Sequence, residues 1–387
     1  MPTIFIPKEV RPGETRVAAV PETVKRMVKD GFTIQIESGA GLGSSIPDKD
    51  FVDVGASIVT DVVAAYANAD VVLKFHPPAF HEGAHAFEAD LPREGAILIS
   101  YLWGRENIET VKTLARRKIT AFALDLLPRI TRAQKMDALS SQANLAGYKA
   151  VLVAAEKLGR IFPLMMTPAG TLKPAKVVIM GAGVAGLQAI ATAKRLGAVV
   201  EVSDVRPAVK EQVESLGGKF IDVPTDASMQ DSGGYAREAS AEFLKKQQEI
   251  VRAHVVAADV IITTALVPGK PAPKLITDDM VADMHAGTVI VDLAAERGGN
   301  CTLTKPGETI VRGGVTIIGT LNLAATVPTH ASDMYAKNLM GVVQNIYKKA
   351  ELNLSFEDEI NAGAIVTHGG EIRIPAIAEL VGGGGKA

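Results

Sequence analysis

Short apolar runs alternate with amphipathic stretches along the first third of the chain. Such runs, bounded by Gly, Pro, Asp or Asn, are typical of strands buried in a parallel sheet, and the stretches between them have helical spacing. The pattern predicts helices at Pro21–Asp30 and Asp61–Asn68. It predicts strands at Thr3–Ile6, Phe32–Glu37, Ala56–Val59, Asp70–Phe75, Ala96–Leu102 and Ile119–Leu124. Strands that alternate with helices indicate a doubly wound parallel sheet.

The same alternation returns further along the chain. Two long helical patterns, Ser140–Leu158 and Ala331–Lys349, flank the second set of strands, and Gly369-Gly370 marks a hairpin between Ala364–Thr367 and Glu371–Ile374. The predicted strands of this set are Val177–Met180, Val199–Val202, Val260–Thr263, Val289–Leu293 and Thr316–Gly319. We therefore expect an α/β protein with two Rossmann-like, doubly wound parallel-sheet domains joined by long helices. The expected domains are residues 1–135 with 330–387, and residues 136–329.

Composition narrows the class of protein. The chain has 387 residues, with 41 basic and 43 acidic side chains, and this balance gives no electrostatic footprint for nucleic acid. The single cysteine, Cys301, excludes an intramolecular disulfide and fits a reducing compartment. No run approaches the ~18 apolar residues of a membrane span. We expect a chain that has no membrane span of its own.

A glycine-rich turn follows the strand Val177–Met180. Gly181, Gly183 and Gly186 form G-x-G-x-x-G, with Ala182 and Val184 between them, and a helical pattern follows at Leu187–Leu196. In dinucleotide-binding folds the first glycine permits the tight turn, the second lets a pyrophosphate approach the backbone, and the third lets the helix pack on the strand. The N-terminus of the helix also favours a phosphate group. The turn predicts a dinucleotide site.

The next strand ends in an acidic residue, Asp204, at the spacing where a carboxylate holds a ribose diol. A carboxylate there favours NAD, because a 2′-phosphate would meet a negative charge. Arg206 lies two residues further on and has the chemistry to bind such a phosphate, so NADP stays open as the alternative.

Two polar loops are further candidates. Leu127–Ser140 carries Arg129, Gln134, Asp137 and Ser140 between a strand end and a long helix, where a cleft would form. The alternative is a solvated connector with a helix N-cap at Asp137 or Ser140. In the second loop, Gly233-Gly234 precedes Tyr235 and would hinge a lid. The alternative there is an ordinary surface loop.

Other candidates are weaker. Thr263–Gly269 and Asp292 lie at carboxyl ends of strands, where open α/β sheets bind ligands, although Asp292 also suits a helix N-cap. Lys74 follows a strand and has the charge to bind a substrate carboxylate, but a solvated strand end is the simpler interpretation. His81 and His85 are the only closely spaced histidines, so no metal site is predicted.

The chain resembles the NAD(H)-binding alpha subunits of proton-translocating nicotinamide nucleotide transhydrogenases, within a superfamily that includes alanine dehydrogenase. The resemblance rests on Arg11–Val17, Pro128–Gln134, Leu139–Gln142, Asn144–Gly147, Gly181–Asp204, Glu211–Phe220 and Pro268–Pro273. Alanine dehydrogenase has a catalytic His in a Tyr-Leu-His setting, whereas this chain reads Tyr101-Leu-Trp103. Amino-acid oxidation would therefore lack its proton acceptor.

The resemblance implies roles for individual residues. The nicotinamide end of NAD(H) would contact Arg129, Gln134, Asp137 and Ser140. The pyrophosphate would lie on Gly181, Ala182, Gly183, Val184 and Gly186, and the adenosine end would contact Asp204, Val205, Arg206 and Leu266. A mobile lid would include Gly234, Tyr235 and Gln247. The lid departs from the family pattern at Ala239, where a Met is usual.

The resemblance also implies an assembly. Hydride would pass directly from NADH to NADP⁺ held by a beta subunit, and protons would cross the membrane in membrane-spanning partner chains. This chain would form a homodimer in the cytoplasm and associate with the inner membrane only through those partners. Two alternatives remain: an NAD-dependent amino-acid oxidoreductase similar to alanine dehydrogenase, and a non-catalytic NAD-sensing module.

Overall fold

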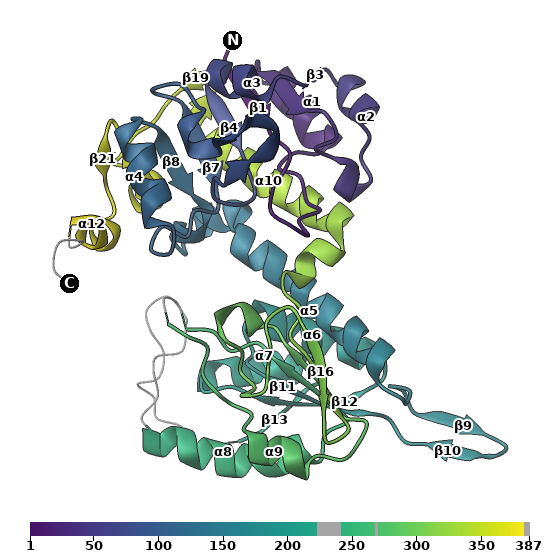
Figure 1. Ribbon diagram of the computed structural model, residues 1–387. Helices are drawn as coiled ribbons and strands as arrows, with labels where there is room; N and C mark the ends of the chain where they lie inside the picture. The colour runs from purple at the N-terminus through teal and green to yellow at the C-terminus, as the bar shows by residue number, and fades with distance from the viewer. Residues whose placement is uncertain (223–240, 268–269, 383–387) are drawn as a thin grey trace. The chain divides into compact units, whose positions relative to one another are not determined.

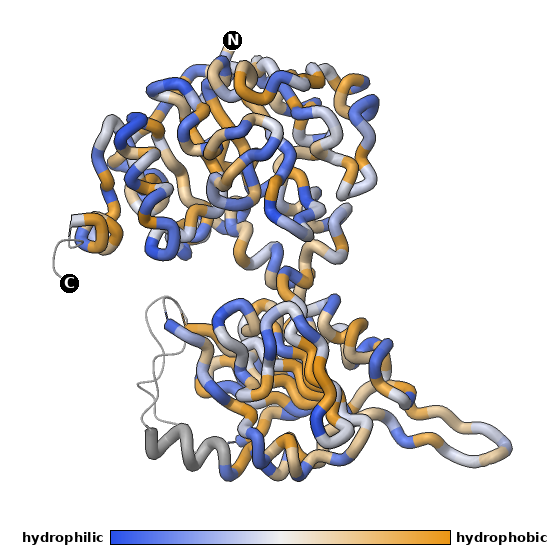
Figure 2. Tube along the Cα trace, viewed as in Figure 1, coloured by the Kyte–Doolittle hydropathy of each residue, from blue (hydrophilic) through white to orange (hydrophobic). Residues whose placement is uncertain are grey.

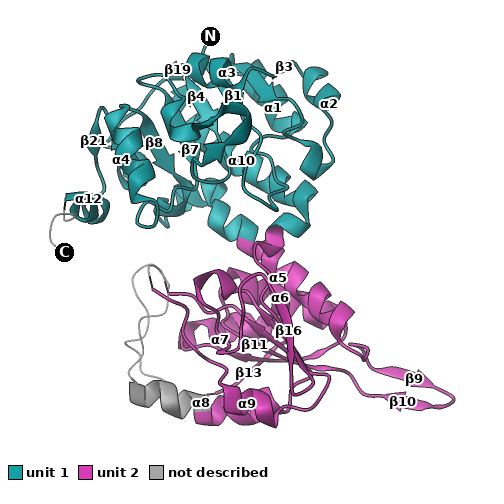
Figure 3. Ribbon diagram, in the orientation of Figure 1, with its two compact units in different colours: residues 1–142, 325–387 teal, residues 143–324 magenta. Residues whose placement is uncertain are grey.

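The computed structural model describes residues 1–222, 241–267 and 270–382, without the side chains of residues 241–248. The chain forms two compact units: unit 1 comprises residues 1–142 and 325–387, and unit 2 comprises residues 143–324 (Figure 3). Helix α5 (Ala138–Lys157) continues across the first boundary, because its first residues belong to unit 1 and the rest to unit 2.

Unit 1 is built on an eight-stranded sheet with β1 next to its centre (Figure 1). Six neighbouring strands are parallel, as the apolar runs predict, whereas the last two strands of the chain join one edge in antiparallel pairing. The order is β21 (Glu371–Ile372), β20 (Ile365–His368), β8 (Thr120–Ala123), β7 (Ile97–Ser100), β4 (Val71–Leu73), β1 (Thr3–Ile6), β2 (Thr33–Glu37) and β3 (Ser57–Val59).

Helices cover both faces of this sheet because its side chains alternate between two cores. Ile4 and Ile6 point into one apolar core and Phe5 into the other. The first core is completed by α1 (Pro21–Lys29), α2 (Asp48–Val52), α10 (Pro328–Ile346) and α11 (Glu359–Ala364). The second is completed by α3 (Val62–Asn68), α4 (Ile108–Arg116) and α12 (Pro375–Gly382).

Unit 2 contains a seven-stranded sheet that is parallel except at one edge. Its central strands are hydrophobic along their length (Figure 2), as expected for strands buried on both faces. The order is β13 (Lys219–Phe220), β12 (Val199–Ser203), β11 (Lys176–Met180), β14 (Val260–Thr263), β15 (Val289–Asp292), β17 (Val315–Ile318) and β16 (Thr309–Arg312). One face packs on α5, α6 (Val184–Arg195) and α7 (Lys210–Ser215), and the other on α8 (Ala241–Val256) and α9 (Asp278–Asp283).

Three small hairpins lie outside the two sheets. They pair β5 (Phe80–His81) with β6 (Ala86–Phe87), β9 (Met165–Thr167) with β10 (Gly170–Leu172), and β18 (Tyr347–Lys348) with β19 (Glu351–Leu352). The apolar pattern predicts none of them. The two doubly wound sheets that it does predict are confirmed, with antiparallel strands added at their edges.

In both sheets the strand order reverses beside one central strand. In unit 2 this strand is β11, which lies between β12 and β14; in unit 1 it is β1, between β2 and β4. Open α/β sheets bind ligands outside the carboxyl ends of the strands at this point. Each unit therefore has one expected crevice.

Candidate functional site

The glycine turn lies at the reversal point of the second sheet, directly after β11. Gly181 has a φ of +102°, which disfavours any residue with a side chain, and its N–H donates to the carbonyl of Ser203 (2.8 Å). A Cβ atom on Gly186 would lie 1.9 Å from the carbonyl oxygen of Gly181. Gly186 therefore permits the close packing of α6 on the turn.

Gly183 has a different environment. A Cβ atom on Gly183 would meet no protein atom within 4 Å, and the backbone at this residue is extended. Gly183 is also the N-cap of α6, and no side chain caps that helix. The chain thus leaves open space at a helix N-terminus whose N–H groups favour an anion.

Asp204 is buried beside the turn. Its carboxylate accepts hydrogen bonds from the N–H of Ala182 (2.7 Å), from the N–H of Arg206 (2.8 Å), and from Arg206 Nε and Nη2 (both 2.9 Å). Arg206 is therefore the ion-pair partner of Asp204, and Val205 between them is half-buried. The predicted ribose carboxylate lies next to the predicted phosphate turn.

Two residues that sequence reasoning did not single out organise the neighbouring loops. Thr264 Oγ1 donates to the carbonyl of Gly181 (2.9 Å), which connects the end of β14 to the glycine turn. Asn300 is fully buried, accepts from Ala265 N–H (3.0 Å) and donates to the carbonyls of Ala265 (2.9 Å) and Pro273 (2.8 Å). A hydroxyl directly after β14 was the available signal for Thr264, but nothing in the sequence pairs Asn300 with that loop. Leu266, which the resemblance places near adenine, lies on the loop that Asn300 holds and is exposed.

Asp292 has a structural role. Its buried carboxylate accepts from Thr263 Oγ1 (2.9 Å), Thr304 Oγ1 (2.6 Å), Ala294 N–H (3.0 Å) and Cys301 N–H (3.1 Å). With four donors satisfied in this way, the side chain holds the loop after β15.

The predicted lid falls mostly outside the described residues. Gly234 and Tyr235 are not described, and neither is Ala239. Gln247 lies within α8, but its side chain is also outside the described portion.

In unit 1 the polar loop is seated on α10. The 3-10 helix Thr131–Met136 buries Met136 against this helix, and Asn338 Nδ2 donates to the carbonyl of Lys135 (2.9 Å). A Cβ atom on Gly341 would lie 3.2 Å from Met136 Cγ, so a glycine there allows the close approach. Arg129 and Gln134 remain exposed on the same loop.

Asp137 caps helix α5. Its Oδ1 accepts from Ser140 N–H (3.0 Å) and its Oδ2 from Ser140 Oγ (2.6 Å), which is the N-cap geometry that the sequence offered as the alternative. A cap fixes the direction of both side chains and is compatible with a binding role. The loop is also held by Arg132, whose Nη1 donates to Asp358 (2.6 Å); this hydrogen bond outweighs partial burial and lowers the pKa of Asp358.

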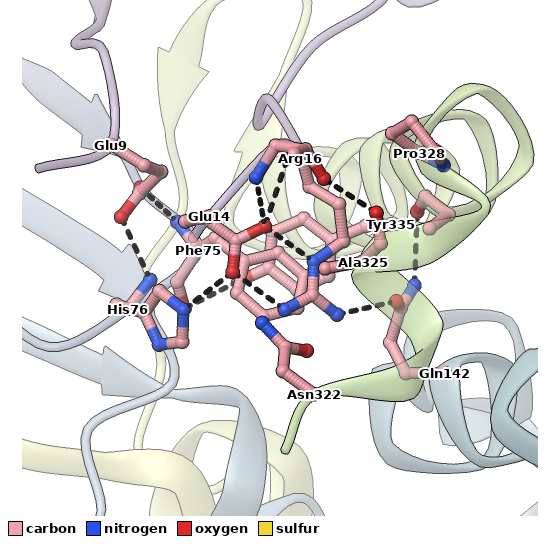
Figure 4. A network of polar contacts seen from close by, with 12 residues as sticks. Glu9, Glu14, Arg16, Phe75, His76, Gln142, Asn322, Ala325, Pro328 and Tyr335 are labelled. Atoms are coloured by element: carbon pink, nitrogen blue, oxygen red, sulfur yellow. Dashed lines mark hydrogen bonds and ion pairs between the residues drawn. The ribbon is translucent and has the colours of Figure 1, made fainter. Parts of the chain in front are cut away.

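The crevice of the first sheet is filled by paired charges rather than left open. Lys74, at the end of β4, is 0% exposed and pairs with Glu88 (2.7 Å) and Glu9 (3.4 Å). Burial opposes the charge, but the two carboxylates prevail and raise the pKa of Lys74. The prediction of a solvated strand end at Lys74 is therefore wrong. Next to this cluster Arg16 pairs with Glu14, and Glu14 also contacts His76 (2.6 Å; Figure 4).

Trp103 occupies the position where the superfamily pattern has histidine. Its φ is +46°, an uncommon conformation for a bulky residue, and its indole stacks on Tyr101 with ring centroids 5.5 Å apart. The strained turn is held by Asp125, whose carboxylate accepts from the N–H groups of Leu102 (2.6 Å) and Trp103 (3.1 Å). Neither ring provides an imidazole for proton transfer.

No group of three His, Cys, Asp or Glu side chains that would hold a metal ion is found in the described ranges. His81 Nδ1 instead accepts a hydrogen bond from Ala84 N–H (3.1 Å). Among the helices in the described portion of the chain, none is both long and apolar enough to cross a bilayer.

Two doubly wound units, one with a glycine turn closed by an acidic strand end, define a Rossmann-like NAD-binding oxidoreductase. The model of the alanine dehydrogenase/PNT N-terminal domain matches residues 5–146, and that of the C-terminal domain matches residues 150–375. The chain therefore belongs to the alanine dehydrogenase/PNT family.

Particular relatives lie on the transhydrogenase side of the family. The chain is 52% identical over 379 residues to an NAD(P) transhydrogenase alpha subunit of Rhodospirillum rubrum, covering 97% of this chain and 98% of the relative. A solved transhydrogenase from Sinorhizobium meliloti superposes with a TM-score of 0.85 at 46% identity, covering 96% of this chain and 99% of that one. A solved L-alanine dehydrogenase gives a TM-score of 0.80 at 27% identity, covering 98% and 99%.

Proposed function

We propose that this chain is the NAD(H)-binding alpha subunit of a proton-translocating NAD(P) transhydrogenase. Hydride leaves the dihydronicotinamide ring of NADH and enters the nicotinamide ring of NADP⁺ on a beta subunit. NADH is oxidised, NADP⁺ is reduced, and no proton is exchanged with solvent in the transfer itself. The observation that carries this proposal is the 52% identity with a transhydrogenase alpha subunit over nearly the whole of both chains, combined with the intact glycine turn.

In unit 2 the adenosine and pyrophosphate parts of NAD(H) are assigned to the glycine turn and the strand end after it. The open space at Gly183 leaves room for a pyrophosphate, and the N-terminus of α6 favours its charge. Asp204, with Val205 and Arg206, takes the ribose; its carboxylate has to exchange some of its contact with Arg206 for the ribose hydroxyls. Gly234, Tyr235, Gln247 and Leu266 keep the lid and adenine roles that the resemblance gives them.

In unit 1 the nicotinamide end is assigned to Arg129, Gln134, Asp137 and Ser140. The cofactor carries the reactivity, so the task of these side chains is to hold one ring at the distance and angle at which hydride passes to the other. The buried seat of the loop on α10 and the cap at Asp137 supply the rigidity that this task needs.

The partners follow from the same proposal. An NADP(H)-binding beta subunit supplies the second nucleotide and a membrane-spanning subunit the proton path, so the chain is peripheral to the inner membrane on its cytoplasmic side. Homodimer formation is supported by the β9–β10 hairpin, which pairs with no further strand among the described residues and exposes Leu164, Met165, Met166 and Leu172. An isolated two-stranded hairpin is marginally stable in water, so a second copy that covers these side chains would stabilise it.

The alternative of amino-acid oxidation is disfavoured by two observations. Trp103 replaces the histidine of the superfamily pattern, and Lys74 is closed off by Glu9 and Glu88. The purified chain should therefore consume no NADH when it is given pyruvate and ammonia.

The deciding experiment combines the chain with an NADP(H)-binding transhydrogenase subunit, NADH and an oxidised NADP analogue whose reduced form absorbs at a distinct wavelength. Reduction of the analogue that requires both subunits is expected. NADH binding without any reduction would favour the NAD-sensing alternative, and NADH loss with pyruvate and ammonia would favour an alanine dehydrogenase activity.

A further inference from the structure

Arg16 is an interior arginine in unit 1 that none of the proposed nucleotide contacts uses. It is 3% exposed, and its guanidinium donates through Nε and Nη2 to the two carboxylate oxygens of Glu14 (both 2.7 Å; Figure 4). The guanidinium also lies 3.5 Å above the ring of Phe75. A bidentate ion pair stacked on an aromatic ring holds the guanidinium in one orientation.

The remaining nitrogen of this guanidinium reaches helix α5. Arg16 Nη1 donates to Gln142 Oε1 (2.9 Å), and Gln142 Nε2 donates to the carbonyl of Ala331 in α10 (2.9 Å). Gln142 is 8% exposed, so both hydrogen bonds lie away from solvent. Its side chain thus connects the buried ion pair, the start of α5 and the start of α10.

Gln142 lies only two residues after Ser140 on α5, whose first turn is capped by Asp137. The other end of the polar loop is already fixed on α10, through Asn338 and the carbonyl of Lys135. The Gln142 bridge is therefore the second anchor of the loop, on its C-terminal side, and both anchors refer the loop to the same helix.

We propose that Arg16 and Gln142 are positioning residues for hydride transfer: their buried contact, passed on to Ala331, sets where Asp137 and Ser140 stand. The inference deepens the proposed function and rests on it. Neither side chain is needed to touch the nucleotide, since both act through the first turn of α5. Losing the bridge should move the ring that receives or gives hydride, and a displacement of about 1 Å is enough to slow a reaction on the order of 100-fold.

Gln142 is the residue to change, because replacing Arg16 would leave Glu14 buried without its partner. Gln142→Met keeps the shape and removes both hydrogen bonds. If that variant does not fold, Gln142→Glu serves the same purpose, because it keeps an acceptor for Arg16 and removes only the donor to Ala331.

Asn361 offers a matched control. It is also a buried amide of unit 1 that accepts one hydrogen bond, from Asn345 Nδ2 (3.1 Å), and donates one, to the carbonyl of Ser355 (2.8 Å). Asn361→Leu should lower the melting temperature about as much as Gln142→Met, because each change removes two buried hydrogen bonds.

Three measurements are made on each full-length variant: NADH affinity, hydride exchange with the NADP(H)-binding subunit, and amide hydrogen exchange of residues 131–141. For Gln142→Met we expect exchange of hydride to fall at least tenfold, NADH affinity to change less than about threefold, and the amides of residues 137–141 to exchange faster. For Asn361→Leu we expect none of the three to change.

Two results would overturn the inference: unchanged amide exchange at residues 137–141 in Gln142→Met, or an equal loss of hydride transfer in Asn361→Leu. Failure of the proposed function has a different signature, because the unmodified chain would then bind NADH or its partner without any hydride exchange. In that case faster amide exchange in Gln142→Met would still establish the anchor, and the role in hydride transfer would be rejected.

Discussion

At the scale of single residues, the three glycines of the turn do three different things. Gly181 is needed for its positive φ and Gly186 for a close approach of backbone to backbone, so both belong to the fold. Gly183 meets no protein atom where a side chain would stand. The fold does not explain why Gly183 lacks a side chain, whereas a bound pyrophosphate does.

This difference predicts opposite outcomes for two alanine substitutions. Gly183→Ala should change the free energy of unfolding by no more than about 1 kcal/mol, because its backbone is one that alanine adopts, yet it should weaken NADH binding at least tenfold. Gly186→Ala should cost more than the about 1–3 kcal/mol typical of overpacking, because its Cβ would lie 1.9 Å from a carbonyl oxygen. Urea unfolding and NADH titration of both variants check this. Unimpaired NADH binding in Gly183→Ala would remove the pyrophosphate from the turn.

Glu14 should make unit 1 sensitive to acid. Burial acts to raise the pKa of Glu14, but hydrogen bonds from Arg16 and His76 outweigh it and hold the pKa far below the usual 4.5. A group whose pKa is lower in the folded state stabilises that state above its unfolded pKa, and the contribution is lost as the pH falls from there toward the folded pKa.

Glu14→Gln should therefore be destabilised at pH 7, by about 3–5 kcal/mol, since Arg16 stays buried without a counter-charge. The difference from the unmodified chain should shrink below about pH 4.5, where the unmodified chain loses the same contribution. Denaturant unfolding at pH 7 and at pH 3.5 measures both values. A difference that is constant across this range would contradict the assignment. The control is Glu109→Gln, because the ion pair of Glu109 with Lys112 is solvent-exposed and worth little.

At the scale of elements, helix α5 crosses α6 with almost no space between them. A Cβ atom on Gly147 would lie 2.1 Å from the carbonyl oxygen of Ala185, in the first turn of α6. Gly147→Ala should therefore push α6 and its phosphate-binding end away from α5, and lower both the melting temperature and NADH affinity. Gly159→Ala, just beyond the same helix, is the control because its Cβ would meet nothing within 4 Å. Thermal melts with and without NADH test this, and equal effects of the two variants would exclude a steric cause.

Elements were also where sequence reasoning was most and least informative. Buried strands such as β11 and β14 were predicted because a continuous apolar run is nearly sufficient for a strand covered on both faces. The β9–β10 hairpin was missed because its side chains are exposed and its sequence has no clean alternation.

The charges were the hardest feature to predict. Lys74 looked solvated because nothing in a linear sequence shows that Glu88, fourteen positions away, returns to pair with it. The glycine turn and the acidic end of β12 were predictable because they are local. For the same reason Asp137 could be recognised as a cap, whereas its second anchor through Gln142 and Ala331 depends on a distant helix.

At the scale of the whole molecule, self-association should depend on the β9–β10 hairpin. Met166, at the middle of β9, is 77% exposed, and a charge there would have to be buried in any interface that covers the hairpin. Met166→Asp should therefore convert dimers to monomers in sedimentation-velocity runs at micromolar concentration. Val311→Asp on the edge strand β16 is the control, since Val311 is similarly exposed but lies outside the hairpin. A Met166→Asp variant that sediments as the unmodified chain does would place the dimer contact elsewhere.

The stacked pair of Tyr101 and Trp103 has a practical consequence for studying the two units separately. Trp103 is the only indole in the chain, and it belongs to unit 1. Emission excited at long ultraviolet wavelengths therefore reports the melting of that unit alone, while calorimetry records both. Comparing the two signals would reveal whether nucleotide bound at the glycine turn of unit 2 protects only that unit or stabilises the entire chain through the shared helix α5.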